Sequence, residues 1–410
     1  MIADRKVEGL QVAATMSAGF FDGSTLAIYL AYLYQYGLSA IWLFIGLALG
    51  YFLLRKHAWK IKQIADANHV YSMPEYFYKI LGKRNGLMFS FLLVLQFFLL
   101  LTLNFVISGK VLANIFSIPY HWAVIIGGVI ILTYLLLAGF KAVVRTDFFQ
   151  LLIMILMSVT VGAVLLGKTS IPMADLGLAS MGLGNIIGFV LIGGLGVMVA
   201  PDLWQRIFAT KDEKNLRRGI SYAAVILTLL ALAISVVGLA TKQFFPGILP
   251  EDALVTGFSQ LLPYGLKEFG MVLLYAVALS SSDTVAFVVS SIFARDFKNY
   301  LPKYGEESMR KLTRYFMVLF VILATIVAIS YQNILALGFS LASLNLMLFP
   351  VVFGTLYWKL KPTAVFWSLV LGFLSVLGLL VGQALTPETA IVCLPVVLIS
   401  LLVLSYFAKK

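Results

Sequence analysis

The stretch YAVALSSSDTVAFVVSS, residues 275–291, places a carboxylate and several hydroxyls near the middle of an otherwise apolar helix. At about 100° per residue, one face of this helix carries Ser280, Asp283, Thr284 and Ser291, with Ser281 at its border. A single serine here is explained by a hydrogen bond back to the carbonyl one turn earlier. A buried aspartate costs about 2.5–3.5 kcal/mol at the centre of a membrane helix, so it normally faces a partner or an ion. Oxygen ligands suit hard cations, and this face therefore predicts a cation or proton site.

The composition around this stretch is that of an integral membrane protein. Hydrophobic residues make up 61% of the 410 residues and charged residues 12%, and the mean hydropathy is +0.99. A soluble domain is about half apolar and a quarter charged. Apolar runs long enough to cross a bilayer as helices recur along the whole chain. We predict an all-α polytopic protein with about twelve spans, at 8–31, 37–54, 86–108, 120–138, 147–167, 184–203, 219–241, 268–293, 312–330, 333–357, 363–382 and 389–407.

The basic residues predict the orientation of these spans. With the N-terminus in the cytoplasm, twelve alternating spans leave only Lys110, Lys168, Lys242 and Lys267 of the 30 Lys and Arg residues on the outer side. Basic residues concentrate on the cytoplasmic side of membrane proteins. We therefore expect a multi-pass protein of the plasma (inner) membrane with both termini in the cytoplasm. The net charge of +12 is then a topology signal with some attraction to anionic lipid, and it does not indicate nucleic-acid binding.

Two further spans depart from plain apolar sequence. The span 8–31 has Gly19, Asp22, Gly23, Ser24 and Thr25 at its midpoint, and the span 184–203 is interrupted by Gly193, Gly194, Gly196 and Pro201. A lone glycine in such a helix usually allows close packing. These two spans lie five helices apart, however, and two units of five helices must insert in opposite orientations. Interrupted helices at corresponding positions of two such halves indicate a transporter binding site, so we predict that both spans are broken.

Three motifs resemble the sodium/solute symporter family, which includes transporters of proline, sialic acid and sugars. They are GFKAVVRTDFFQ at 139–150, APDLWQRIFATKDEKNLRRG at 200–219 and ALSSSDTVAFVVSSIFARDF at 278–297. The resemblance covers roughly residues 8–357 and implies the five-plus-five inverted repeat of the leucine transporter. The expected units are residues 1–182 as the first repeat, 183–358 as the second, and 359–410 as two peripheral C-terminal helices.

The resemblance also implies two sodium sites. The common site would use the backbone carbonyls of Phe20, Gly23 and Val277 and the hydroxyls of Ser280 and Ser281. A second site, found in part of the family, would use Asp147, Ser280, Asp283 and Thr284. The sequence departs from the family pattern at Asp283, where a small hydroxyl residue is usual, and at Arg145, which could pair with Asp147. The extra carboxylate of Asp283 could tighten sodium binding, or titrate with protons if burial raises its pKa.

The expected solute site lies beside these ions. In family terms Asp22, Ser24 and Thr25 lie next to both ion and solute, and the span 86–108 should face the same cavity. The residues carried over to the solute site are Asp22, Ser24, Thr25, Gln96, Leu100, Asn104, Val197, Pro201 and Trp204. No known solute-binding set around the second, third and tenth spans matches this sequence.

These observations predict a sodium-coupled symporter that imports a small organic solute, with an amino acid favoured because Asp22 could pair with its amino group. A proton-coupled symporter on the same fold is the nearest alternative, and a transporter-like sensor would need a separate signalling partner. An intramembrane enzyme is disfavoured, because the sequence shows no nucleophile–base set and no metal motif such as H-E-x-x-H. We expect Na+ as coupling ion, with H+ possible, and no cofactor, transition metal, nucleic acid or obligate protein partner. Cys393 is the single cysteine.

Overall fold

The computed structural model describes residues 7–70, 72–138, 152, 155–156, 158–167, 170–298 and 306–407. Within these ranges the regular elements are helices, and the one β-type pairing is an isolated bridge between Val7 and Thr210. The elements are α1 (Gly9–Phe20), α2 (Gly23–Tyr36), η2 (Gly37–Ile41), α3 (Trp42–Ala67), α4 (Met73–Leu81), α5 (Lys83–Phe116), α6 (Tyr120–Ala138), η3 (Met173–Leu176), α8 (Leu183–Val199), α9 (Pro201–Ala209), α10 (Glu213–Phe244), η4 (Pro250–Asp252), α11 (Ala253–Gln260), α12 (Leu266–Lys298), α13 (Glu306–Ser330), α14 (Ile334–Leu346), α15 (Phe349–Tyr357), α16 (Pro362–Val381), α17 (Pro387–Ala390) and α18 (Cys393–Phe407).

The helices are long and apolar enough to form a multi-pass membrane protein. By length and composition, eight helical segments of the described chain could cross a membrane, or nine if the bent pair α8–α9 forms one span. Parts of the predicted fifth span, 147–167, lie outside the described residues. The all-helical class is thus confirmed, whereas the count of twelve, the orientation of the termini and the division at residues 182 and 358 stay predictions.

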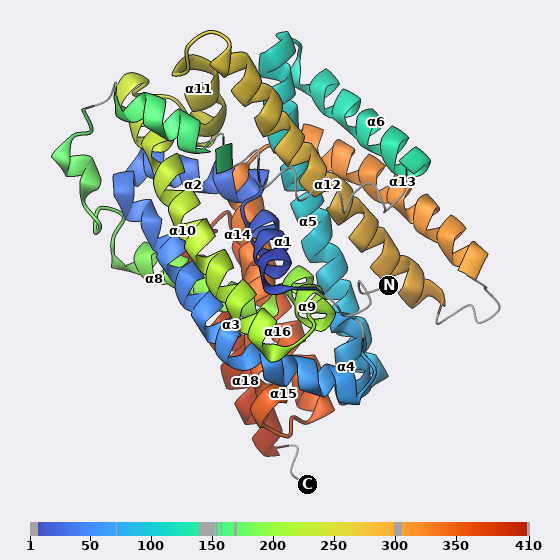
Figure 1. Ribbon diagram of the computed structural model, residues 1–410. Coiled ribbons are helices and arrows are strands. Elements are labelled where there is room, and N and C mark those ends of the chain that lie inside the picture. The colour runs from blue at the N-terminus through green and yellow to red at the C-terminus, as the bar shows by residue number, and fades with distance from the viewer. Residues whose placement is uncertain are drawn as a thin grey trace.

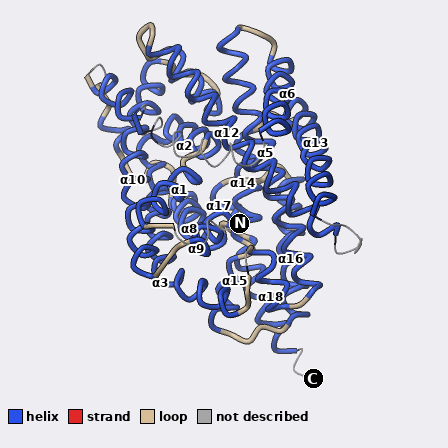
Figure 2. Tube along the Cα trace, turned by 45° about the vertical axis from the view of Figure 1, so that its right-hand side comes forward, coloured by secondary structure: helices blue, strands red, loops and turns tan. Residues whose placement is uncertain are grey.

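The broken first span lies at the centre of the bundle (Figure 1). In α1, Val12, Ala13 and Met16 are completely buried, and the helix packs against α10 and α9. The helices α5 and α12 pack against each other, α6 and α13 lie together along one edge, and α16 packs on α18 near the C-terminal end (Figures 1 and 2). Polar residues of the central helices are therefore shielded by a periphery that exposes large apolar side chains.

The interruption predicted in the first span lies between α1 and α2. Phe21 and Asp22 leave the helical conformation, with φ/ψ of −97°/62° and −98°/176°. Neither glycine of this stretch forms the break, because Gly19 belongs to α1 and Gly23 is the first residue of α2. Breaking of the span is confirmed, and it occurs at these two non-helical residues, of which Asp22 is extended.

The interruption predicted in the sixth span lies between α8 and α9, which meet at a 44° bend. Ala200 is extended, with φ/ψ of −70°/113°, and Pro201 begins α9. A proline has no N–H to continue the helix, so it fits the first position of a new one. The break is confirmed at Pro201.

The glycines before this break have a different role from the one predicted. Gly193 and Gly194 lie inside α8, where α8 packs closely against α3. A Cβ on Gly50 would lie 2.3 Å from the Gly194 carbonyl oxygen, and one on Gly193 would lie 2.4 Å from the Leu43 carbonyl oxygen. The expectation that these glycines interrupt the helix was wrong, since they permit backbone contact between two helices.

Candidate functional site

The first helix break is closed by its own side chains. The Asp22 carboxylate accepts a hydrogen bond from the Thr25 backbone N–H at 2.8 Å and from the Ser24 hydroxyl at 2.7 and 2.8 Å. Asp22 and Ser24 are both buried. An acidic N-cap satisfies the free amides of a helix start and interacts favourably with its dipole. Asp22 therefore holds the start of α2 in place beside the break.

The start of α2 packs directly on the polar stretch of α12. A Cβ on Gly23 would lie 3.1 Å from the Ala278 Cβ, so a side chain there would press on α12. One residue before Ala278 is Val277, whose carbonyl oxygen accepts a hydrogen bond from the Ser281 hydroxyl at 3.1 Å. Three residues predicted for the common sodium site, Gly23, Val277 and Ser281, thus lie on the two helices that meet here, and a fourth, Phe20, is the last residue of α1.

The predicted second sodium site is described only in part. Asp283 is buried within α12, and the Thr284 hydroxyl donates a hydrogen bond to its Oδ1 at 3.1 Å. Asp147 lies outside the described residues, as does the side chain of Ser280. This geometry places a buried carboxylate and a hydroxyl together on α12, and the ligand set of a second ion stays a proposal.

A cavity of about 160 Å³ lies between α2, α3, α8 and α14. Its wall is mostly apolar, with Phe44, Phe189 and Phe339 among the lining residues, and its polar side chains are Thr25 and Asn345. Phe20 and Thr25, which flank the first break, both contribute to the wall. The cavity is smaller than the about 300–1,000 Å³ typical of sites for drug-sized ligands, so it suits a small solute.

Most residues predicted for the solute site are not part of this cavity wall. Thr25 lines it, and the other eight predicted residues, all described, do not. On α5, Gln96 and Asn104 are buried, and the Gln96 Oε1 and both amide atoms of Asn104 have no hydrogen-bond partner among the described residues. Buried amides are nearly always paired. Neither side chain lines the cavity, and Leu100 lies between them in the sequence, so their place in the solute site stays a prediction.

The residues predicted from the sixth span lie on the two helices that meet at the second break. Val197, Pro201 and Trp204 are all buried, and the Trp204 indole N–H donates a hydrogen bond to the Met198 carbonyl at 2.9 Å. The Trp204 ring packs edge-on against Tyr76 and Phe208. A helix that ends at a proline leaves carbonyls without their usual donors. Trp204 satisfies one of them across the bend.

Asn345 was missed by the sequence analysis. Its amide Nδ2 donates to the Gly196 carbonyl at 3.3 Å, and its buried Oδ1 has no partner among the described residues. It therefore connects α14 to the end of α8 and to the cavity. A lone amide in the apolar run SLASLNLMLFP, residues 340–350, was the available signal, because polar groups in membrane helices usually face the protein interior.

The sequence matches a described protein family over most of its length. Residues 1–174 and 184–372 match the sodium:solute symporter family. The sodium/proline symporter of Staphylococcus aureus strain Newman is 29% identical over 391 residues, which cover 88% of this chain and 75% of that protein. The same share and identity hold for the sodium/proline symporter of strain JH9.

Solved structures support the LeuT-like fold class. A substrate-bound, outward-open Na+-coupled sialic acid symporter superposes with a TM-score of 0.78 at 16% identity, covering 98% of this chain and 90% of that one. MhsT in complex with L-phenylalanine gives a TM-score of 0.62 at 14% identity, covering 97% and 98%. At these identities the likeness concerns the fold alone.

Proposed function

The chain belongs to the sodium:solute symporter family, and we propose that it imports a small, largely apolar amino acid together with Na+ by alternating access. As a member of this family it is a multi-pass membrane transporter and not an enzyme. The proposed location is the plasma membrane with both termini in the cytoplasm, as the basic residues favour. The proposed solute class rests on the cavity and on the proline symporters among the relatives.

The observation that carries the proposal is the position of the cavity. Phe20 and Thr25 line it, and between them in the sequence Gly23 contacts α12 at Ala278. A solute in this cavity would lie within one or two helical turns of the proposed common sodium ligands Phe20, Gly23, Val277, Ser280 and Ser281. Occupancy of one site would then stabilise the helix break that forms the other. Such coupling is reciprocal, so Na+ should tighten solute binding by the same factor that solute tightens Na+ binding.

The cavity lining also defines the proposed solute. The wall has four phenylalanines and several aliphatic side chains, with one hydroxyl and one amide as polar groups. An aliphatic or ring-shaped side chain would pack against the aromatic wall. The amino and carboxylate groups would need polar partners, and Thr25, Asn345 and the free backbone groups at the two breaks are the candidates.

Asp22 has a positioning role in this proposal. Its carboxylate is engaged by the Thr25 amide and the Ser24 hydroxyl, so it shapes the break that presents carbonyls to the ion. Gln96, Asn104 and the proposed second site of Asp147, Ser280, Asp283 and Thr284 would serve an additional ion or the solute path. In a proton-coupled version, Asp283 would be the group that binds and releases H+.

Uptake by the purified protein in proteoliposomes tests the proposal. We expect L-proline or another small apolar amino acid to accumulate when a Na+ gradient is imposed, and not when choline replaces Na+. At 100 mV each Na+ entering contributes about 2.3 kcal/mol. Uptake driven by an inward H+ gradient in sodium-free buffer would show that the coupling ion is H+ and not Na+.

Two variants separate ion binding from solute binding. Ala342→Phe places a phenyl ring from the wall into the cavity and should abolish solute uptake. In this variant Na+ should still raise the thermal unfolding midpoint, because it binds the folded state. Ser281→Ala should lower the apparent Na+ affinity in the same unfolding assay. If Ala342→Phe transports normally, the solute lies elsewhere. If Ser281→Ala keeps the sodium dependence unchanged, the hydroxyl is not a sodium ligand.

A further inference from the structure

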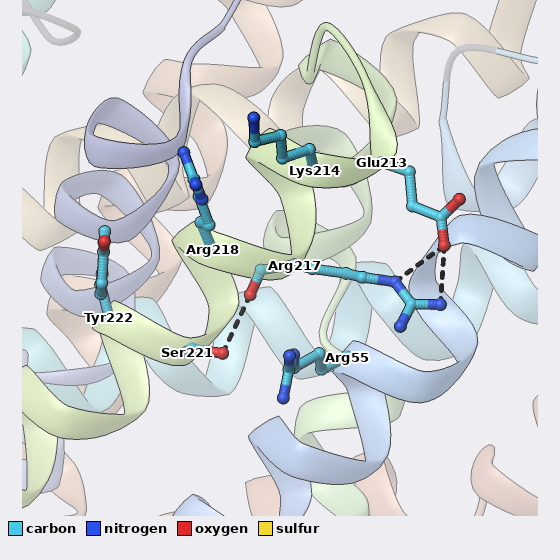
Figure 3. A pocket seen from close by; sticks show the side chains of 7 residues that line it. All are labelled: Arg55, Glu213, Lys214, Arg217, Arg218, Ser221 and Tyr222. Carbon is cyan, nitrogen blue, oxygen red and sulfur yellow. Dashed lines mark hydrogen bonds and ion pairs between the residues drawn. The ribbon is translucent and has the colours of Figure 1, made fainter.

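A basic hollow lies at the N-terminal end of α10, beside the middle of α3 and away from the cavity and the helix breaks. It has a volume of about 520 Å³ and is lined by Arg55 of α3 and by Lys214, Arg217 and Arg218 of α10 (Figure 3). One carboxylate, Glu213, also lines it. Four cations and one carboxylate leave a concentrated positive charge in a concave site.

Most of this charge has no counter-charge among the residues that the structure describes. Arg217 pairs with Glu213 at 2.6 Å, whereas the described residues provide no ion-pair partner for Arg55, Lys214 or Arg218. In Figure 3, Arg218 and Tyr222 lie away from the Arg217–Glu213 pair. A hollow with three unpaired cations from two helices favours an anion with several oxygens, such as a phosphate group.

The position of the hollow relative to the membrane indicates the source of that phosphate. The apolar run 37–54 ends directly before Arg55, and the run 219–241 begins directly after Arg218. Because α3 packs against α10, both helices pass from hydrocarbon to headgroup depth at this hollow. The 32-residue helix α10 is about 48 Å long, longer than a hydrocarbon core of about 30 Å, so its first turns extend into the headgroup region.

An apolar surface continues from the hollow along α10. Tyr222, which lines the hollow, is followed at helical spacing by Val225, Leu229 and Leu232, and all four are exposed. Tyrosine favours the membrane interface, with its ring near the chains and its hydroxyl near the headgroups. A lipid with its phosphate among the cations would lay an acyl chain along this row, which a free phosphate could not use.

We propose that this hollow binds the phosphate headgroup of an anionic phospholipid. Basic pockets between membrane helices on the cytoplasmic side bind such headgroups in general. Arg55 and Arg218 would contact the phosphate from opposite helices, Lys214 would add charge at the rim, and Tyr222 would cover the glycerol region. The bound lipid would hold the N-terminal end of α10 against the middle of α3 from outside the bundle.

The test follows thermal unfolding of the full-length protein in detergent with three separate probes. These are dihexanoyl phosphatidylglycerol, dihexanoyl phosphatidylcholine and inorganic phosphate. We expect saturable stabilisation by phosphatidylglycerol, with weak effects of the other two. The variant Arg55→Gln/Arg218→Gln should weaken the apparent phosphatidylglycerol affinity roughly 30-fold.

The matched control is Arg310→Gln/Arg314→Gln on α13, which removes two exposed arginines on the same predicted side and should leave the affinity unchanged. Equal losses in both double variants would overturn the site. Phosphatidylcholine acting as well as phosphatidylglycerol would overturn the anion preference, and phosphate acting as well as the lipid would assign the hollow to a soluble anion.

A charge-retaining variant distinguishes loss of the positive charge from misfolding. Arg55→Lys/Arg218→Lys should keep most of the affinity, because the phosphate still meets two cations. If the glutamine double variant does not give a monodisperse protein, the exposed single variant Lys214→Gln is titrated in the same way. Two results together would also contradict the proposal. They are an unchanged phosphatidylglycerol affinity of Lys214→Gln, and stabilisation of Arg55→Lys/Arg218→Lys by phosphatidylcholine as large as that by phosphatidylglycerol.

Discussion

The two helix breaks of this protein are stabilised in different ways. Between α1 and α2, Asp22 accepts hydrogen bonds from its own neighbours Ser24 and Thr25. Between α8 and α9, Pro201 ends the helix, and the freed carbonyls are met by Trp204 and by Asn345 from α14. The first break is held by side chains within three residues, whereas the second also depends on Asn345, which lies 149 positions from its partner Gly196. The first should therefore be lost by changing one side chain, and the second should weaken in several smaller steps.

The largest effect is expected from Asp22→Ala. The variant removes the N-cap of α2 and leaves the part-buried Thr25 N–H and the buried Ser24 hydroxyl without their acceptor, so we expect a loss of about 2–4 kcal/mol in unfolding free energy. Chemical unfolding in detergent measures it. Asp22→Asn keeps an acceptor oxygen at the same place and should lose clearly less. Equal losses would mean that the cap does not hold the break.

A smaller effect is expected from Gly50→Ala. The new Cβ would lie 2.3 Å from the Gly194 carbonyl oxygen, so α3 and α8 must separate, at about 1–3 kcal/mol. The control is Gly378→Ala on α16, where nothing lies within 4 Å and a gain of about 0.5–1 kcal/mol is expected from helix propensity. Comparison of the two unfolding midpoints checks the result. An unchanged midpoint of Gly50→Ala would contradict the close-packing role of this glycine contact and would favour the original interpretation of Gly193 and Gly194 as helix-interrupting residues.

Trp204→Phe should weaken the second break alone. The ring packing is largely kept, but the Met198 carbonyl loses its donor, which costs about 1–2 kcal/mol for a buried acceptor. Trp42→Phe is the control, because its indole N–H also donates to a carbonyl, that of Leu178 at 2.7 Å, but in an exposed position. Water can replace that donor. If both variants unfold alike, the bond at the bend contributes nothing specific.

The smallest effect on stability is expected from Asn345→Leu. The hydrogen bond to Gly196 is long at 3.3 Å, and its loss should change the unfolding free energy by less than about 1 kcal/mol. Because Asn345 is one of two polar side chains in the cavity wall, the solute concentration for half-maximal uptake should nevertheless rise. An uptake assay in proteoliposomes measures it, and an unchanged half-saturation would remove Asn345 from the solute site.

The contrast between the breaks also explains which parts of the site could be predicted. The sequence pattern DGST at 22–25 contains both the cap and the residues it holds, so the first break was predictable from adjacent residues. The glycines before Pro201 were misassigned, because flexibility and close packing require the same residue and only the partner α3 distinguishes them. Trp204 was expected at the solute, which stays a prediction, and the structure adds that it packs in an aromatic cluster with Tyr76 and Phe208.

By itself the sequence determined the membrane environment, the helical class, the two interrupted spans and the polar face of α12, because each depends on hydrophobicity or on residues within one helical turn. Only the tertiary structure decided that Gly23 contacts Ala278, that Asn345 reaches Gly196, and that a cavity opens between α2, α3, α8 and α14. These contacts join residues more than a hundred positions apart. Their geometry depends on how closely whole helices approach, which is set by side-chain volumes on both partners and not by the local sequence of either one.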